Sequence, residues 1–373
     1  MNLIVAIAIA IFVYTLQKLI YRRNWNRNLD VDLSFSDTCV SVGDSGMLVE
    51  QIHNAKALPL PVLHVKFSVS RSFLFEDSDN SSVTDSYYRN DVFSIAGNRR
   101  ITRRLKFTAT KRGLFQVTGI QLGAKDFFLS ETFASRIKSD AWMYVLPKRY
   151  ESPDFQAWLQ QLIGENEIPR GLNEDPFTFR GIRDYSTQDT MRKVNWKATA
   201  RTGDLKVNVY GYSSSQRVCI LLNLEPNSMI RIGEMQEIAI GMTSTVAAQL
   251  LENKIPTQIC SSGIDILSGQ CDKVSFGASM EHCITIDKYL ARIREHAGLE
   301  TFGRLLDAQM QNLQRDITYL VISPYYKEDL LLKLDEMVRQ GVDVKMLVPY
   351  YDIQNQSNWR PYMHGWEVKL VEI

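Results

Sequence analysis

The segment "RVCILLNL" (217–224), followed by "GEMQEIAIGMTSTVAAQLLENK" (233–254), decides the fold of the C-terminal part of the chain. The first run is apolar without alternation, which is typical of a parallel strand buried on both faces. In the second, Ile238, Met242, Val246 and Leu250 recur every four residues, so they lie on one face of a helix. A buried strand that leads into an amphipathic helix predicts an α/β domain.

The same alternation continues to the end of the chain. "IPTQICSS" (255–262), "ITYLVISP" (317–324), "VDVKMLVPY" (342–350) and "WEVKLVEI" (366–373) are expected strands. Helices are expected over 281–296, 299–314 and 327–341, the last ending at Gly341. Alternating strands and helices predict a doubly wound α/β domain over 211–373.

Residues 28–148 have the composition of an antiparallel β-sandwich. Short alternating runs such as "RRITRRLKFTATK" (99–111) and "GLFQVTGIQLG" (113–123) are separated by glycines and polar turns. The stretch "EDSDNSSVTDS" (76–86) has almost no apolar residues and is expected to be a loop or a hairpin tip. The whole chain is therefore predicted to be an α+β multidomain protein.

The N-terminus has the features of a transmembrane helix. Residues 3–16, "LIVAIAIAIFVYTL", carry no charge, and with Leu19 and Ile20 the apolar stretch approaches the roughly 20 residues that cross a bilayer. Basic residues follow the span instead of preceding it, which argues against a cleaved signal peptide. Their position predicts a single-pass anchor, residues 1–24, with the bulk of the chain in the cytoplasm.

Charge and cysteine content restrict the class of protein. The 373 residues carry a formal net charge of only +1, and the basic residues are spread along the chain. A nucleic-acid partner is therefore not expected. The five cysteines form no C-x-x-C pair, which fits a reducing compartment. The sequence contains no H-E-x-x-H, G-x-S-x-G, Walker or dinucleotide-binding motif, and we predict no enzymatic activity.

A connector, 149–210, contains the most unusual segment, "FRGIRDYSTQDTMRKVNWKATARTGDLKV" (179–207). We expect Asp189 to cap a helix over 190–199 and Gly203 to end it. Such a helix would place Asp189, Arg192 and Trp196 on one face and Arg201 on a neighbouring one. Before the helix, Arg180, Arg183 and Asp184 surround Gly181, where a backbone could approach another group closely.

Two interpretations of this segment remain open. Its Arg and Asp residues could form ion pairs that dock the α/β domain onto the sandwich, with Trp196 as an apolar plug. Alternatively, the arginines could form a basic groove for a phosphorylated ligand or an acidic partner. The absence of a glycine-rich phosphate loop favours the docking role.

The segment resembles the signature of the bacterial family of unknown function DUF 58. The matching positions are Gly181, Arg183, Asp184, Tyr185, Asp189, Arg192, Val194, Trp196, Ala200 and Arg201. Gln188 stands where the family usually has glycine. The resemblance covers most of the chain and implies a membrane anchor, a sandwich and a C-terminal domain similar to von Willebrand factor A. Members of the family often have two membrane helices, whereas this sequence has one.

A von Willebrand A domain typically holds Mg²⁺ through an Asp-x-Ser-x-Ser motif after its first strand. Here Asn223, Glu225 and Asn227 occupy the three ligand positions. Because this set departs from the motif, the sequence favours an interaction face without a cofactor over a Mg²⁺ site.

The resemblance also implies a partner, a MoxR-type AAA+ ATPase. We therefore expect a membrane-anchored, non-enzymatic adaptor that works with such an ATPase in the assembly or remodelling of client complexes. The alternative is a sensor or enzyme that acts on an anionic, phosphorylated ligand through the central arginines.

Overall fold

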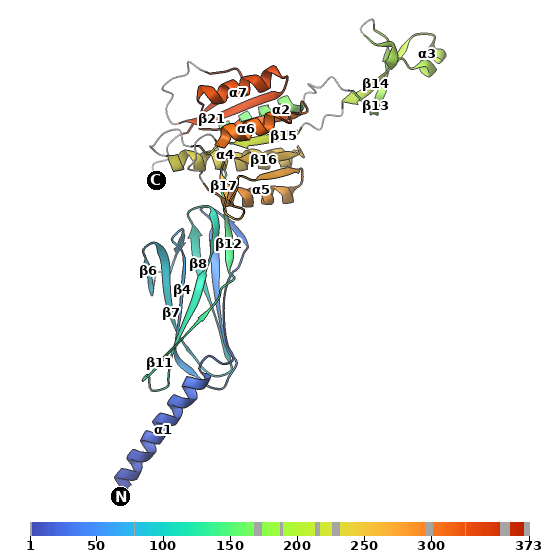
Figure 1. The fold of residues 1–373 in the computed structure, drawn as a ribbon. Helices are drawn as coiled ribbons and strands as arrows, with labels where there is room; N and C mark the ends of the chain where they lie inside the picture. Colours follow the sequence, from blue (N-terminus) through green and yellow to red (C-terminus); the bar gives the residue numbers. More distant parts are fainter. Residues whose placement is uncertain are drawn as a thin grey trace. The chain divides into compact units, whose positions relative to one another are not determined.

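The computed structural model describes residues 2–77, 79–167, 174–186, 189–212, 217–225, 232–294, 301–324, 326–350 and 359–368. Its contacts divide the chain into two compact units, one of Met1–Lys148 with Leu290–Arg292 and one of Arg149–Tyr289 with Ile293–Ile373. The fold combines α-helices, antiparallel sheets and one mainly parallel sheet (Figure 1). The two units are described in turn.

The first unit is a β-sandwich that follows one apolar helix, α1 (Asn2–Asn24). A four-stranded sheet has the order β1-β3-β8-β5, a five-stranded sheet has the order β11-β10-β4-β7-β6, and a third has the order β2-β12-β9. All neighbouring strands are antiparallel except β2 and β12. The strands are β1 (Leu29–Phe35), β2 (Cys39–Ser41), β3 (Ser45–Asn54), β4 (Leu60–Ser70), β5 (Phe73–Phe75), β6 (Ser81–Val83), β7 (Ser86–Ile95), β8 (Arg99–Ala109), β9 (Gly113–Gln116), β10 (Thr118–Lys125), β11 (Thr132–Ile137) and β12 (Trp142–Leu146).

Helix α1 is apolar along its N-terminal part and joined to the sandwich at its C-terminal end. Within it, Leu3–Asn24 is long and apolar enough to cross a membrane, with a mean hydropathy of 2.3 in its most apolar window. By contrast, Tyr21 and Trp25 are buried in the core of the sandwich, where the indole of Trp25 stacks on the ring of Phe133. A boundary between anchor and sandwich at residue 24 would separate Tyr21 from the core to which it belongs. The end of the helix is therefore part of the sandwich.

A buried charged cluster connects the two larger sheets of the sandwich. On β7, Arg89 donates from Nε to Asp91 at 2.6 Å and from Nη2 to Asp77 at 2.9 Å, and the side chains of Arg89 and Asp91 are fully buried. On β8, Arg103 donates to the same two carboxylates at 2.9 and 2.6 Å. Burial, followed by the nearby charge of Asp91, raises the pKa of Glu50 on β3 to about 8. The stretch expected to be a loop or a hairpin tip contains the hairpin turn between β6 and β7, and it also supplies Asp77 to this cluster.

The second unit contains a six-stranded sheet of order β18-β16-β15-β20-β21-β22. Five strands are parallel, as predicted, and β18 pairs antiparallel to β16 at one edge. The order reverses between β15 and β20, where the carboxyl ends of strands form the usual ligand-binding crevice of such sheets. The strands are β15 (Arg217–Leu222), β16 (Thr257–Ser261), β18 (Lys273–Gly277), β20 (Ile317–Ile322), β21 (Asp343–Tyr350) and β22 (Met363–Glu367).

Helices cover this sheet on both sides. The helices α6 (Thr301–Met310) and α7 (Glu328–Arg339) share one apolar core with alternate residues of β15, β20 and β21. Helix α4 (Ile232–Glu252) contacts β15 from the opposite face. The unit also contains most of α5 (Met280–Arg292), up to Tyr289, and a short pair, β17 (Ile264–Asp265) with β19 (Ile293–Arg294).

The predicted connector is in part an integral piece of this second unit. It forms α2 (Pro153–Glu167), which contacts α4. Just before this helix, the backbone N of Tyr150 donates to Thr245 at 2.8 Å, and the Tyr150 hydroxyl accepts from the indole of Trp366 at 2.9 Å. Only the later part, with β13 (Glu174–Asp184) and β14 (Lys206–Tyr212), forms a separate hairpin.

Candidate functional site

The signature segment folds as an antiparallel hairpin of β13 and β14 with two short helical turns between its strands. Asp184 pairs with Lys206 across the hairpin, and Gly181 lies at an irregularity of the strand register. A Cβ added to Gly181 would meet nothing within 4 Å, so the described chain makes no close approach there. The glycine instead fits a β-bulge, where an irregular backbone is common.

The helix predicted over 190–199 is confirmed only from Trp196 onward. A 3₁₀ turn, η1 (Met191–Lys193), is followed by an isolated bridge from Val194 to Val207 and then by α3 (Trp196–Thr202). Asn195 caps α3 by accepting from the backbone N of Ala198 at 3.0 Å, and Gly203, at φ 79°, ends the helix as expected. The buried bridge interrupts what would have been one continuous helix.

Asp189 has a different partner from the one expected. Both of its carboxylate oxygens accept from the guanidinium of Arg183 at 2.6 Å, and one also accepts from the backbone N of Ser186 at 2.8 Å. The hydrogen bond from Arg183 is the largest cause that lowers the pKa of Asp189. Asp189 and Trp196 are thus not on one helical face, because Asp189 precedes η1 and Trp196 begins α3.

A second ion pair also lies within the described part of the hairpin. Lys206 forms an ion pair with Asp184, and this contact raises the pKa of Lys206. Arg183 donates a further bond to the carbonyl of Asp184 at 3.0 Å. A ligand phosphate would have to displace Asp189 to bind Arg183, which weakens the case for a basic anion-binding groove.

Four large apolar side chains of the hairpin are exposed. Trp196 is 62% exposed and Met191 57%, and Ile182 and Leu205 are exposed as well. We call these four residues the hairpin patch. Tyr185 is half-buried and donates its backbone N to Leu205 at 2.9 Å, and Arg201 is exposed in the last turn of α3. The side chains of Arg180 and Arg192 lie outside the described part of the chain.

The positions predicted for a degenerate metal site lie at the carboxyl edge of the parallel sheet. Asn223 follows β15, is fully buried, and donates from Nδ2 to the hydroxyl of Ser323 at 3.0 Å. Its Oδ1 accepts from the backbone N of Glu225 at 2.9 Å. The hydroxyl of Ser262, after β16, accepts from the backbone N of Leu224 at 2.9 Å. The ends of three neighbouring strands therefore meet in one hydrogen-bonded cluster.

The carboxylate in this cluster already serves as a helix cap. Glu225 accepts from the backbone N of Phe302, in the first turn of α6, at 2.6 Å. Negative charge is favourable there because the first amides of a helix lack partners. Asn227 lies outside the described residues, and no group of three or more His, Cys, Asp and Glu in the described part could hold a metal ion. The donor set does not fit Mg²⁺, which prefers carboxylate oxygens.

Removing the amide of Asn223 is expected to destabilise the α/β unit. Asn223→Ala would remove the buried hydrogen bonds to the Ser323 hydroxyl and from the backbone N of Glu225, at a cost of about 1–3 kcal/mol. Asn253→Ala, at the exposed end of α4, is the matched control and should change stability little. Thermal unfolding should show this difference, and neither Mg²⁺ nor EDTA should shift the wild-type transition. A clear shift with Mg²⁺ would instead favour a metal site.

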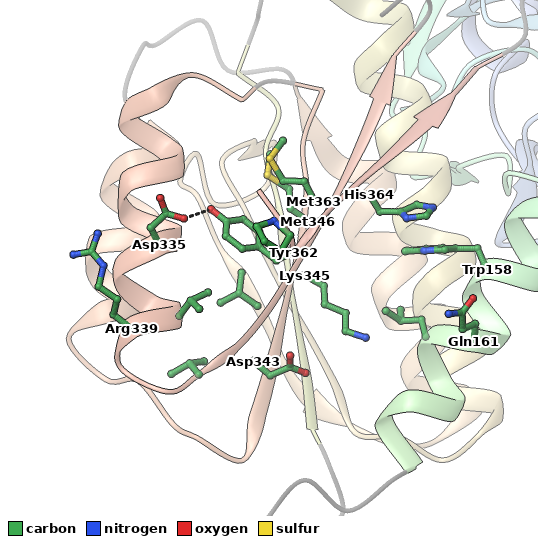
Figure 2. A pocket seen from close by; sticks show the side chains of 15 residues that line it. Trp158, Gln161, Asp335, Arg339, Asp343, Lys345, Met346, Tyr362, Met363 and His364 are labelled. Carbon is green, nitrogen blue, oxygen red and sulfur yellow. Dashed lines mark hydrogen bonds between the residues drawn. The ribbon is translucent and has the colours of Figure 1, made fainter. Parts of the chain in front are cut away.

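A hollow that no sequence pattern indicated lies at the other end of the parallel strands (Figure 2). Its wall is formed by α2, α7 and the beginnings of β21 and β22. His364 stacks on the indole of Trp158, with ring centroids 5.0 Å apart, and burial lowers the pKa of His364. The Tyr362 hydroxyl bonds Asp335 at 2.8 Å. The hollow lies away from the carboxyl edge, where ligands of doubly wound sheets bind.

Comparisons with known proteins leave the family open. No protein-family model matches the chain, and no curated protein matches it. Among solved structures, the CARDB domain of a Pyrococcus furiosus protein has a TM-score of 0.19 at 12% identity, covering 30% of this chain and 93% of that one. A cohesin from Archaeoglobus fulgidus has a TM-score of 0.22 at 12% identity, covering 35% and 97%. Similarity at this level carries no argument about function.

Proposed function

We propose that the chain is a membrane-anchored interaction protein whose hairpin patch binds a protein partner. The observation that carries this proposal is the presence of four exposed apolar side chains together with two ion pairs, Arg183–Asp189 and Lys206–Asp184, inside the hairpin. Exposed large apolar side chains often mark protein-binding surfaces, and Trp is enriched among the residues that dominate binding. An anion-binding groove would require Arg183 to be open to the ligand, whereas its guanidinium is held by Asp189.

The anchor is proposed to be a retained transmembrane helix. Lys18, Arg22, Arg23 and Arg27 all follow the apolar stretch, which favours a cytoplasmic location for the two units that follow. The burial of Tyr21 and Trp25 in the sandwich supports retention, because cleavage near the end of the apolar stretch would remove core side chains.

The C-terminal unit is proposed to be similar to von Willebrand factor A. Numbered by their order along the chain, the sheet strands run 3-2-1-4-5-6, with the third antiparallel at the edge, and this arrangement supports the assignment. The metal positions of such a domain are replaced here by Asn223 and by Glu225, which caps α6. We therefore propose a protein-binding role for this unit without a metal.

The partner implied by the resemblance is a MoxR-type AAA+ ATPase, which would use the complex to remodel client assemblies. The experiment is association of the full chain, reconstituted in lipid nanodiscs, with a MoxR-type AAA+ ATPase from the same genome. A fragment that begins at residue 28 is unsuitable because it lacks Tyr21 and Trp25 of the sandwich core. We expect tighter association in ATP than in ADP, whereas equal absence of binding in both would contradict the proposal.

A further inference from the structure

The turn between β10 and β11 exposes three consecutive large apolar side chains. Phe127 is 60% exposed, Phe128 52% and Leu129 53%. We call these residues the hairpin tip of the sandwich. Soluble surfaces rarely present three such residues in a row, and an exposed apolar group of this kind usually marks a contact with a partner or a membrane.

The backbone of this turn is held so that the apolar side chains face outward. Asp126 is fully buried and accepts from the hydroxyl of Ser130 at 2.6 Å and from the backbone N of Glu131 at 2.8 Å. Leu129 donates its backbone N to the carbonyl of Asp126 at 2.9 Å. Its φ of 59° lies in the left-handed region, which is unfavourable for a leucine. The turn thus keeps a strained, apolar, exposed residue that the sandwich core does not use.

The turn also contacts the apolar helix α1 directly. Gln17 donates from Nε2 to Asp126 at 2.7 Å, and Lys18 forms an ion pair with Glu131 at 3.4 Å. Three residues before Gln17, the ring of Tyr14 lies near that of Phe128, with the two ring centroids 6.1 Å apart. Figure 1 shows the β11 end of the sandwich next to the end of α1. The hairpin tip is therefore fixed at the level of residue 14 of the helix.

This level falls inside the stretch that must cross the bilayer. The apolar residues from Leu3 to Ile20 form about 27 Å of helix at 1.5 Å per residue, close to the ~30 Å of a hydrocarbon core. Tyr14 lies six residues before Ile20, or about 9 Å deeper. Interfacial segments bury their apolar faces to a similar depth of about 5–10 Å. The contacts of the turn also give Gln17 and Lys18 polar partners where lipid would offer none.

From this geometry we infer that the hairpin tip inserts into the leaflet that faces the sandwich and contacts acyl chains. The inference rests on the proposed membrane anchor. Because Tyr21 and Trp25 join α1 to the sandwich core, no flexible linker separates the two contacts with the membrane. Helix and tip together would hold the sandwich in one orientation on the bilayer.

The test places the photoreactive residue p-benzoylphenylalanine at one of three exposed positions of the full chain. The protein is reconstituted in vesicles of phosphatidylethanolamine and phosphatidylglycerol, irradiated, and analysed for lipid adducts by mass spectrometry. Phe128 reports the tip, and Ile9 in α1, 58% exposed, reports the anchor. Val83 on β6, 59% exposed, is the matched control on the sandwich surface.

We expect lipid adducts at Phe128 and Ile9, each roughly tenfold above the yield at Val83. Adducts at Ile9 alone would overturn the insertion of the tip and leave the anchor intact. Absence of adducts at all three positions would overturn the anchor and the inference with it. Equal yields at Val83 and Phe128, or a protein adduct at Phe128 in place of lipid, would also overturn the inference.

Discussion

Trp196→Gln is expected to weaken binding of the AAA+ partner at least tenfold, or about 1.4 kcal/mol, without lowering the stability of the chain. Trp196 is 62% exposed and begins a helix of only seven residues, so its indole contributes little to the fold. In a complex, the same ring would supply the largest apolar area of the hairpin patch. The affinity is measured by titrating the ATPase against the full chain in nanodiscs.

The matched control for this variant is Leu332→Gln. Leu332 is 52% exposed on α7, outside the hairpin, and the two variants introduce the same side chain. Both should unfold at the wild-type temperature, and only Trp196→Gln should lose affinity. An equal loss in both variants, or in neither, would remove the hairpin patch from the binding surface.

Arg89→Met is expected to destabilise the sandwich by about 3–5 kcal/mol, the usual cost of removing one partner from a buried ion pair. The substitution keeps an apolar chain of similar length and removes one of the two guanidinium charges that pair with Asp91, whose side chain is fully buried. It also removes one of the two arginines whose charges lower the pKa of the buried Glu50. Thermal and denaturant unfolding of the full chain in detergent measure the loss.

A compensated variant separates charge from packing. In Arg89→Met combined with Asp91→Asn and Glu50→Gln, neither neighbour can carry an unpaired charge, so part of the lost stability should return. If the triple variant is as unstable as Arg89→Met alone, the loss comes from packing around Arg89. In that case, the buried charges do not account for the stability of the sandwich.

The elements that the sequence predicted well are those with strong local patterns. The continuous apolar run of β15 and the four-residue repeat of α4 require burial wherever they occur, so both were found. The edge strand β18 was missed because its five residues are only partly buried and follow a loop rich in Gly and Ser. The cluster around Arg89 gave no local signal, because its members come from β3, β7, β8 and the turn before β6.

The sequence predicts which segment forms the candidate site, but it does not predict how that segment folds. The segment with Arg183, Asp189 and Trp196 was located from its composition, and Gly203 ends its helix as expected. The cap was misassigned because Asp189 and Asn195 are both good caps, and only the bridge from Val194 to Val207 decides between them. That bridge joins residues thirteen positions apart in the sequence, and a search for helical periodicity does not detect such a contact. Docking of the segment onto the sandwich stays a prediction.

Hydrogen–deuterium exchange of the complex tests the central claim most directly. The full chain in nanodiscs is compared with and without the AAA+ ATPase in the presence of ATP. We predict that the backbone amides of 189–205, around the hairpin patch, exchange more slowly in the complex. Unchanged exchange in this segment, with protection confined to other surfaces of the chain, would contradict the claim that the hairpin is where the partner binds.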